Sequence, residues 1–465
     1  MSQPKSGVLA FALACTAINT TAQAATADEL AAIRQQIEVI RTQYETRLAD
    51  LEKKLSEAER RLESAEHLPL AAQSPRASSV APSGLDTSLI LQGQFARMKD
   101  VAERNPTGFL PAGHEHGGDK RGFSTGHSEL VLAANIDPYW RGKAVFALTN
   151  DQTVEVEEAS FQRIGSDDGV GFKTGRFRSG IGYLNEQHPH AWDFVDAPLV
   201  YQALFGRHGA YTQEGVQLKW LAPLDDLALT FGAEAGRGVS FPATERNKNR
   251  QDSAALFAKL GGDLGASNSW QAGVSYLLTS ATDREGHLED ASSPAVESFS
   301  KFSGKSQLWL ADFVWKWAPD GNPSYRNFTF QTEVFARRED GDMACTNGDS
   351  GTSLCANQLG NYRSQQDGWY AQAVYQFMPR WRVGYRVDQL NSGTPSLNSI
   401  NISPDNAFLQ PYKPRRDSVM LDYRWSEFSR ARLQLSQDKS MAGMTDNQLF
   451  LQYIMSLGAH GAHKF

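Results

Sequence analysis

Sixteen segments from Ser88 onward place apolar side chains at every second position, and this repeat constrains the fold more than any other feature of the sequence. In one such segment Trp270 and Ala272 alternate with Gln271. Successive side chains of a β-strand point to opposite faces, so each segment is predicted to be a strand with one apolar face. The segments cover 89–95, 130–136, 144–148, 154–165, 170–178, 216–220, 227–234, 253–264, 270–279, 309–317, 325–338, 367–378, 381–388, 416–426, 430–438 and 449–457; 154–165 and 170–178 alternate least regularly.

The connections between these segments alternate in length. Short turns such as 137–139, 222–226 and 378–380 are separated by mostly longer polar loops at 99–123, 179–212, 238–252, 282–302, 339–366 and 391–415. A soluble β-sandwich also shows alternation of period two, but barrels of the outer membrane pair short periplasmic turns with long extracellular loops. We therefore expect an all-β fold, a 16-stranded antiparallel transmembrane β-barrel over residues 87–465.

Aromatic residues support the barrel, because they gather at the strand ends next to the short turns. Trp220, Trp270 and Trp381 are examples, and the chain ends in Phe465. Such a girdle is typical of a membrane interface. After the first 20 residues there is no run of 18 apolar residues, so a transmembrane helix is not expected.

The first 24 residues are predicted to be a signal peptide. Lys5 precedes an apolar stretch over 8–18, and Ala22 and Ala24 stand at the small-residue positions before a cleavage site. A buried N-terminal helix is the alternative. Cys15 lies within a marginal lipid-attachment sequence, but we expect it to leave with the signal.

Residues 25–67 are predicted to form a periplasmic coiled coil. Apolar residues from Leu30 to Ala65 are spaced three and four apart, with one inserted step near Tyr44, and the stretch from Asp28 to Glu66 contains no Gly or Pro. So narrow an apolar seam favours identical partner helices, and we expect a homotrimer. The alternative is a lone helix lying on its own domain. Residues 68–86 contain Pro, Ala and Ser and are expected to be a linker.

Only Cys345 and Cys355 remain after the signal peptide, within a stretch rich in Gly, Asn, Ser and Thr. In an exported protein, a lone pair of cysteines ten residues apart indicates a disulfide that closes a loop.

Charged residues on the expected lumen face suggest an ion preference. Nine basic residues share that face with six acidic ones, and arginines fall on neighbouring strands. A positive ladder opposite a constriction loop would favour anions. The alternative is that the arginines only pair with Asp388 and Asp422. The expected pore-lining residues are Arg382, Arg386, Arg424, Arg432, Lys143 and Lys219.

The segment 179–212 is the candidate constriction loop. It is long and rich in apolar and aromatic residues, which an exposed loop would not keep in water. We expect it to fold into the lumen and to present His188, His190, Asp193 and Asp196; packing outside, against a neighbouring protomer, is the alternative.

Few residues suggest chemistry beyond transport. His114 and His116 are weak candidates for a metal site, and a solvated loop tip is the simpler interpretation. His127 and Ser128 are adjacent and would face opposite sides of a strand, so they do not form a hydrolytic pair. The net charge of −7 argues against nucleic acid as a partner. We expect no enzymatic activity and no cofactor.

Signal peptide, coiled coil, linker, barrel and terminal Phe465 together resemble the trimeric bacterial outer-membrane porins that carry a periplasmic coiled-coil arm, such as sucrose porins and dicarboxylate channels. The barrel also resembles the phosphate-selective porins. The resemblance implies a water-filled channel in the outer membrane of a Gram-negative cell, passing small solutes by passive diffusion, with a modest anion preference. The alternatives are an uptake channel for metal of the zinc type or for metal complexes, and a non-transport barrel that tethers the envelope.

Overall fold

A computed structural model of the chain describes residues 84–101, 104–110, 120–148, 153–164, 168–206, 209–244, 249, 251–290, 293–347, 358–398 and 410–458. The expected signal peptide, the coiled coil and nearly all of the linker lie outside these residues, as do Phe465, His114, His116 and Cys355. Those expectations therefore stay predictions.

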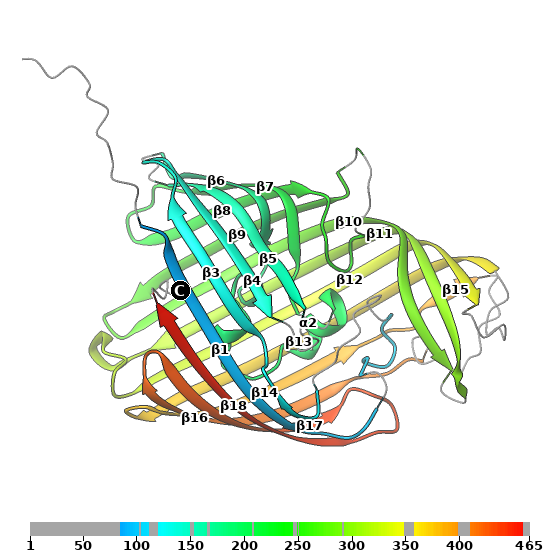
Figure 1. Cartoon of the computed structure of the whole chain (residues 1–465). Helices are drawn as coiled ribbons and strands as arrows, with labels where there is room; N and C mark the ends of the chain where they lie inside the picture. The colour runs from blue at the N-terminus through cyan, green and yellow to red at the C-terminus, as the bar shows by residue number, and fades with distance from the viewer. Residues whose placement is uncertain are drawn as a thin grey trace, which may run out of the picture. The chain divides into compact units, whose positions relative to one another are not determined.

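Sixteen long strands of the described chain form one closed antiparallel sheet (Figure 1), which confirms the predicted barrel. Each strand pairs with the next along the chain, and β1 pairs with β18 to close the ring, with Leu89 opposite Leu457. The strands are β1 (Asp86–Arg97), β3 (Ser128–Asn135), β4 (Trp140–Leu148), β5 (Val154–Arg163), β6 (Val170–Arg178), β7 (Thr212–Leu221), β8 (Leu227–Gly236), β9 (Ser253–Leu264), β10 (Asn268–Asp290), β11 (Ser293–Trp317), β12 (Asn327–Asn347), β13 (Gln358–Met378), β14 (Trp381–Asn391), β16 (Arg415–Ser426), β17 (Ser429–Lys439) and β18 (Asp446–Gly458).

Short elements complete the described fold. The three-residue strand β2 (Gly122–Ser124) pairs with β1, and β15 (Ser396–Asn398) pairs with β13. The helical turns are η1 (Leu184–Glu186), η2 (Pro189–Ala191), α2 (Leu199–Phe205) and η3 (Pro319–Gly321). None of the helices in the described ranges has the length and apolar character needed to cross a membrane.

Two hairpins correct the sequence prediction, which placed loops at 282–302 and 339–366. Strands β10 and β11 contain 23 and 25 residues and continue through most of the first range. Strands β12 and β13 each contain 21 residues and occupy most of the second. A barrel strand crosses the bilayer in roughly 9–11 residues, so these four extend well beyond it. Their outer parts lack the apolar alternation that lipid imposes, which is why the sequence pattern missed them.

The outside of the barrel is apolar and the inside is polar. On β14, Val383 and Tyr385 are 39% and 47% exposed, whereas Arg382 and Arg386, which flank them, are 7% and 1% exposed. Aromatic rings touch one another near the short turns: Trp381 lies 4.8 Å from Tyr423, which lies 5.0 Å from Trp425, measured between ring centroids. An apolar band flanked by an aromatic girdle is the surface that a lipid bilayer covers.

The main apolar core of the described chain lies inside the barrel rather than between layers. It is built around α2, whose Tyr201 and Phe205 are almost fully buried. The Tyr201 ring meets the wall at Phe335 of β12, with 5.1 Å between ring centroids. Because α2 belongs to the connection between β6 and β7, this packing brings that connection into the lumen (Figure 1).

Candidate functional site

Residues 179–211, called the inward loop below, connect β6 to β7 and cross the barrel interior. The loop is closed at its base by Asn185, whose Nδ2 donates to the carbonyl oxygens of Ser179 (2.8 Å) and Tyr211 (3.0 Å). At the far side, the backbone N–H of Val195 donates to Oε1 of Gln434 on β17, at 2.8 Å. The inward loop therefore extends from β6 and β7 across the lumen to β17 on the opposite side of the barrel.

Glu333 of β12 anchors the inward loop through three hydrogen bonds. Its side chain is fully buried and accepts hydrogen bonds from two backbone N–H groups of the loop, those of Tyr183 (3.2 Å) and Leu184 (3.0 Å). It also accepts from the hydroxyls of Tyr201 (2.9 Å) and Tyr370 (2.6 Å). Four donors converge on one carboxylate, so replacing it would leave several buried donors without an acceptor.

Acidic side chains of the loop bind basic side chains of the wall. Glu186 accepts from Lys219 at 2.7 Å and from Lys259 at 2.9 Å. Asp193 pairs with Arg382 on β14 at 2.7 Å. These contacts join the loop to three different strands, so its position does not depend on apolar packing alone.

Asp196 of the loop binds two arginines of the wall. It lies 2.9 Å from Arg386 on β14 and 2.6 Å from Arg416 on β16. Burial raises the pKa of Asp196, but Arg386 and Arg416 outweigh that effect and lower it to about 2. The carboxylate is therefore charged throughout the range in which a barrel works.

Three of the four arginines expected in the positive ladder, Arg382, Arg386 and Arg432, form ion pairs in the structure. Arg382 and Arg386 touch the loop aspartates Asp193 and Asp196 directly, and Arg432 pairs with Asp422 at 2.7 Å. The alternative, pairing with wall acids, also holds, since Arg386 lies 3.0 Å from Asp388 and Arg382 contacts Asp422. Direct pairing neutralises much of the field that separated charges would have produced.

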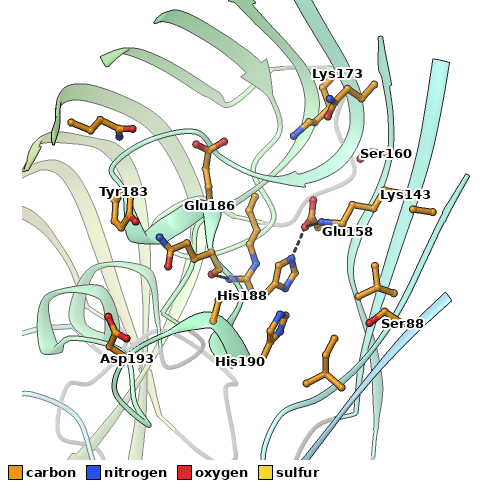
Figure 2. Close-up of a pocket in the computed structure, with 18 of the residues that line it drawn as sticks. Ser88, Lys143, Glu158, Ser160, Lys173, Tyr183, Glu186, His188, His190 and Asp193 are labelled. Atoms are coloured by element: carbon orange, nitrogen blue, oxygen red, sulfur yellow. Dashed lines mark hydrogen bonds and ion pairs between the residues drawn. The ribbon is translucent and has the colours of Figure 1, made fainter. Parts of the chain in front are cut away.

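A cavity of about 840 Å³ lies between the inward loop and the wall (Figure 2). Seven basic residues line it against four acidic ones. The basic residues are Arg141, Lys143, Lys173, Arg178, Lys259, Lys316 and Arg382, and the acidic ones are Asp86, Glu158, Glu186 and Asp193. Of the residues expected at the pore, Arg382, Lys143, His188, His190 and Asp193 line this cavity, whereas Arg386, Arg424, Arg432, Lys219 and Asp196 are not part of its lining.

His188 and His190 meet a group of wall glutamates. Nδ1 of His188 lies 2.9 Å from Oε2 of Glu157, and its Nε2 lies 2.6 Å from Oε1 of Glu158. Nδ1 of His190 lies 3.1 Å from Oε1 of Glu129. Burial and Arg178 lower the pKa of His188, but the charge of Glu129 and the hydrogen bonds with Glu129 and Glu157 outweigh them and raise it to about 10. The group thus attracts positive charge.

Sequence patterning missed Glu157 and Glu158, because two adjacent residues of a regular strand cannot face the same side. In β5 the pairing shifts by one residue, with Val145 opposite Glu158 and Phe146 opposite Val156, so Glu157 is the extra residue of a β-bulge. Both carboxylates thereby point into the barrel. The poor alternation of 154–165 was the only sequence signal of this irregularity.

A closed antiparallel barrel with an apolar outer band, an aromatic girdle and a polar interior crossed by one loop defines an integral β-barrel protein of the bacterial outer membrane. The chain belongs to the same family as an uncharacterised protein of Aquifex aeolicus (strain VF5), with 34% identity over 407 residues, 82% of this chain and 80% of the relative. No family model matches the sequence.

Solved structures of similar architecture are distant in sequence. The outer membrane channel DcaP of Acinetobacter baumannii has a TM-score of 0.46 and 12% identity, covering 82% of this chain and 99% of that one. OprB of Pseudomonas putida has a TM-score of 0.45 and 14% identity, with 80% and 94% covered. An anion-selective porin from Comamonas acidovorans has a TM-score of 0.46 and 9% identity, with 81% and 100% covered. Likenesses this weak say nothing about solute or mechanism.

Proposed function

We propose that the protein is a porin, a water-filled channel through which small solutes diffuse passively, with a modest preference for anions. The observation that carries the proposal is the cavity beside the inward loop, whose lining has seven basic and four acidic residues. A basic lining lowers the electrostatic barrier for anions and raises it for cations. Guanidinium and ammonium groups in contact with water bind anions weakly, so solutes can leave as well as enter.

We assign the ion selectivity to residues that line the cavity and not to the ladder of arginines that the sequence suggested. Lys173 and Lys316 line the cavity, whereas Arg386 and Arg432 are held by wall and loop carboxylates outside it. We infer that the cavity lysines set the field that a passing solute meets. The inward loop narrows the path by filling part of the lumen with its own side chains.

Reversal potentials in planar bilayers test this proposal. In a KCl gradient the wild-type channel should show an anion-selective potential, and the double variant K173Q/K316Q should shift it toward cation selectivity. The matched control R415Q/K439Q also removes two positive charges, but from positions outside the cavity lining, and should leave the reversal potential unchanged. Arg415 is half exposed on β16. Absent conductance, or a cation-selective wild type, would contradict the proposal.

We further propose a homotrimer joined by the coiled coil over 25–67, and a disulfide between Cys345 and Cys355. The heptad seam and the cysteine spacing support these two features. Crosslinking in mild detergent should yield trimers, and thiol labelling before reduction should modify neither cysteine. Monomers alone, or full labelling, would contradict the respective feature.

A further inference from the structure

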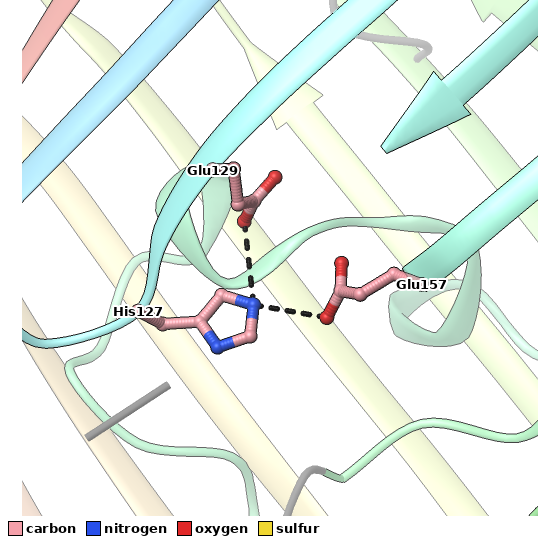
Figure 3. Close-up of side chains that lie close together, drawn as sticks. All are labelled: His127, Glu129 and Glu157. Carbon is pink, nitrogen blue, oxygen red and sulfur yellow. Dashed lines mark ion pairs between the residues drawn. The ribbon is translucent and has the colours of Figure 1, made fainter. Parts of the chain in front are cut away.

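A cluster of imidazole and carboxylate groups lies inside the barrel where β3 begins (Figure 3). Nε2 of His127 lies 2.9 Å from Oε1 of Glu157 and 3.7 Å from Oε1 of Glu129. Each of the three side chains offers a ligand atom within 4.8 Å of the other two. A metal ion bound at about 2.0–2.2 Å in tetrahedral geometry holds its ligand atoms about 3.3–3.6 Å apart, so only small movements separate this arrangement from a coordination shell.

The inward loop brings two more imidazoles to the same place. Nδ1 of His188 lies 3.2 Å from Oε2 of Glu129, and Nδ1 of His190 lies 3.1 Å from its Oε1. The rings of His188 and His190 stack, with centroids 5.9 Å apart. Either histidine could supply a fourth ligand from the loop side.

The cluster holds buried polar atoms in poorly aligned contacts. Glu129 is only 1% exposed, and its Oε2 lies 3.2 Å from Nδ1 of His188, while Nε2 of His127 lies 2.9 Å from Oε1 of Glu157. Neither contact has the angular geometry of a hydrogen bond. A cation bound between these atoms would satisfy them better than these contacts do, so they mark the place where an ion would sit.

The charge around the cluster also favours a divalent cation. The cluster contains three carboxylates, those of Glu129, Glu157 and Glu158. The positively charged groups paired with them are Arg178 and Lys143. Metal binding displaces the protons of the ligating imidazoles, and with these imidazoles neutral the group carries one net negative charge. Arg178 donates to Glu157 at 3.0 Å and Lys143 to Glu158 at 2.8 Å, so both orient carboxylates in the way that outer partners orient metal ligands.

We propose that the protein binds one zinc-type divalent ion through His127, Glu129 and Glu157, with His188 or His190 as the fourth ligand. Imidazole nitrogen and carboxylate oxygen are ligands that Zn²⁺ prefers in tetrahedral sites. The ion joins β3 and β5 to the inward loop, so it locks the loop against the wall. His188, His190 and Glu158 line the cavity, which gives the ion a route from water. The site adds metal binding to the proposed channel and does not depend on the solute that the channel passes.

Calorimetric titration of ZnCl₂ into the EDTA-treated, detergent-purified full chain tests the site. We expect one ion per chain, and at least a tenfold weaker affinity in each of the variants H127N and E129Q. The matched control E285Q neutralises a glutamate outside the cluster, one that pairs with Lys301 at 3.1 Å, and should bind as wild type does. Affinity that is unchanged in H127N and E129Q, or lost in E285Q, would overturn the proposal.

Three further measurements check the folding of the variants and the coordination of the ion. Heat-modifiable migration reports whether each variant forms the barrel, and a variant that fails this check is replaced by H190N/H188N, whose side chains belong to the loop. Co²⁺ added to the wild-type chain should give the visible absorption of a tetrahedral site with nitrogen ligands, and Zn²⁺ should slow hydrogen exchange in residues 188–192. A Co²⁺ spectrum of the hydrated ion, or no protection of the loop, would also overturn the proposal.

Discussion

Replacing Glu333 by alanine should release the inward loop while leaving the barrel closed. The carboxylate accepts four hydrogen bonds, from the backbone N–H groups of Tyr183 and Leu184 and from the hydroxyls of Tyr201 and Tyr370. The barrel wall does not need it, because β12 keeps its backbone ladder with β11 and β13. The variant therefore separates attachment of the loop from formation of the sheet.

The size of the effect follows from the number of lost acceptors. A buried hydrogen bond contributes about 1–1.5 kcal/mol net, so the loss of four costs about 4–6 kcal/mol. The cost applies to the state in which the loop is attached, and each 1.4 kcal/mol changes an equilibrium about tenfold. The population in which the loop is detached should rise by about a thousandfold or more.

Hydrogen exchange measured by mass spectrometry detects this change directly, because detachment exposes the N–H groups of Tyr183 and Leu184. Peptides covering 181–187 should exchange much faster in E333A, and single-channel conductance should increase. The control E285A removes an exposed glutamate that lies 3.1 Å from Lys301, a pair expected to contribute at most about 1 kcal/mol. Equal exchange in E333A and wild type would refute the role of Glu333 as the anchor.

Acid and packing variants give two further tests. The pKa of Asp196 is lowered to about 2, so its ion pairs stabilise the fold at pH values above the usual Asp pKa of 3.8 and are lost as the pH falls from there toward 2. The urea midpoint of D196N should therefore fall less steeply than that of wild type between pH 4 and pH 2. Parallel curves of urea midpoint against pH would contradict this. In G232A the new Cβ would collide with the Phe257 ring, and overpacking should cost about 1–3 kcal/mol in urea unfolding. In the control G93A nothing lies within 4 Å of the new Cβ, and stability should be nearly unchanged.

The strand count and the two faces of the wall could be predicted because lipid imposes an apolar residue at every second position. The pattern is plain on β14, where Val383 and Tyr385 face outward between Arg382 and Arg386. The hairpins β10–β11 and β12–β13 extend beyond the lipid, where that requirement ends, and the same pattern could not detect their outer halves.

The apolar composition of the inward loop also indicated a buried position. A segment with Trp192, Phe194 and Tyr201 cannot stay in water, and the barrel interior offered the nearest place to bury it. Its partners could not be predicted, since the contact of Asp196 with Arg386 joins residues 190 positions apart. The two-residue period placed the arginines on the lumen face, but only the fold brought Asp193 against Arg382 and Asp196 against Arg386.

By itself, the sequence determined which residues face lipid, because a two-residue period acts along each strand independently of the rest of the chain. The tertiary structure decided which lumen residues meet. The bulge in β5 turns both Glu157 and Glu158 inward, and loop closure brings His188 to both of them. These contacts depend on strand register and on the path of a loop across the barrel, and neither is encoded in the local alternation of apolar and polar residues.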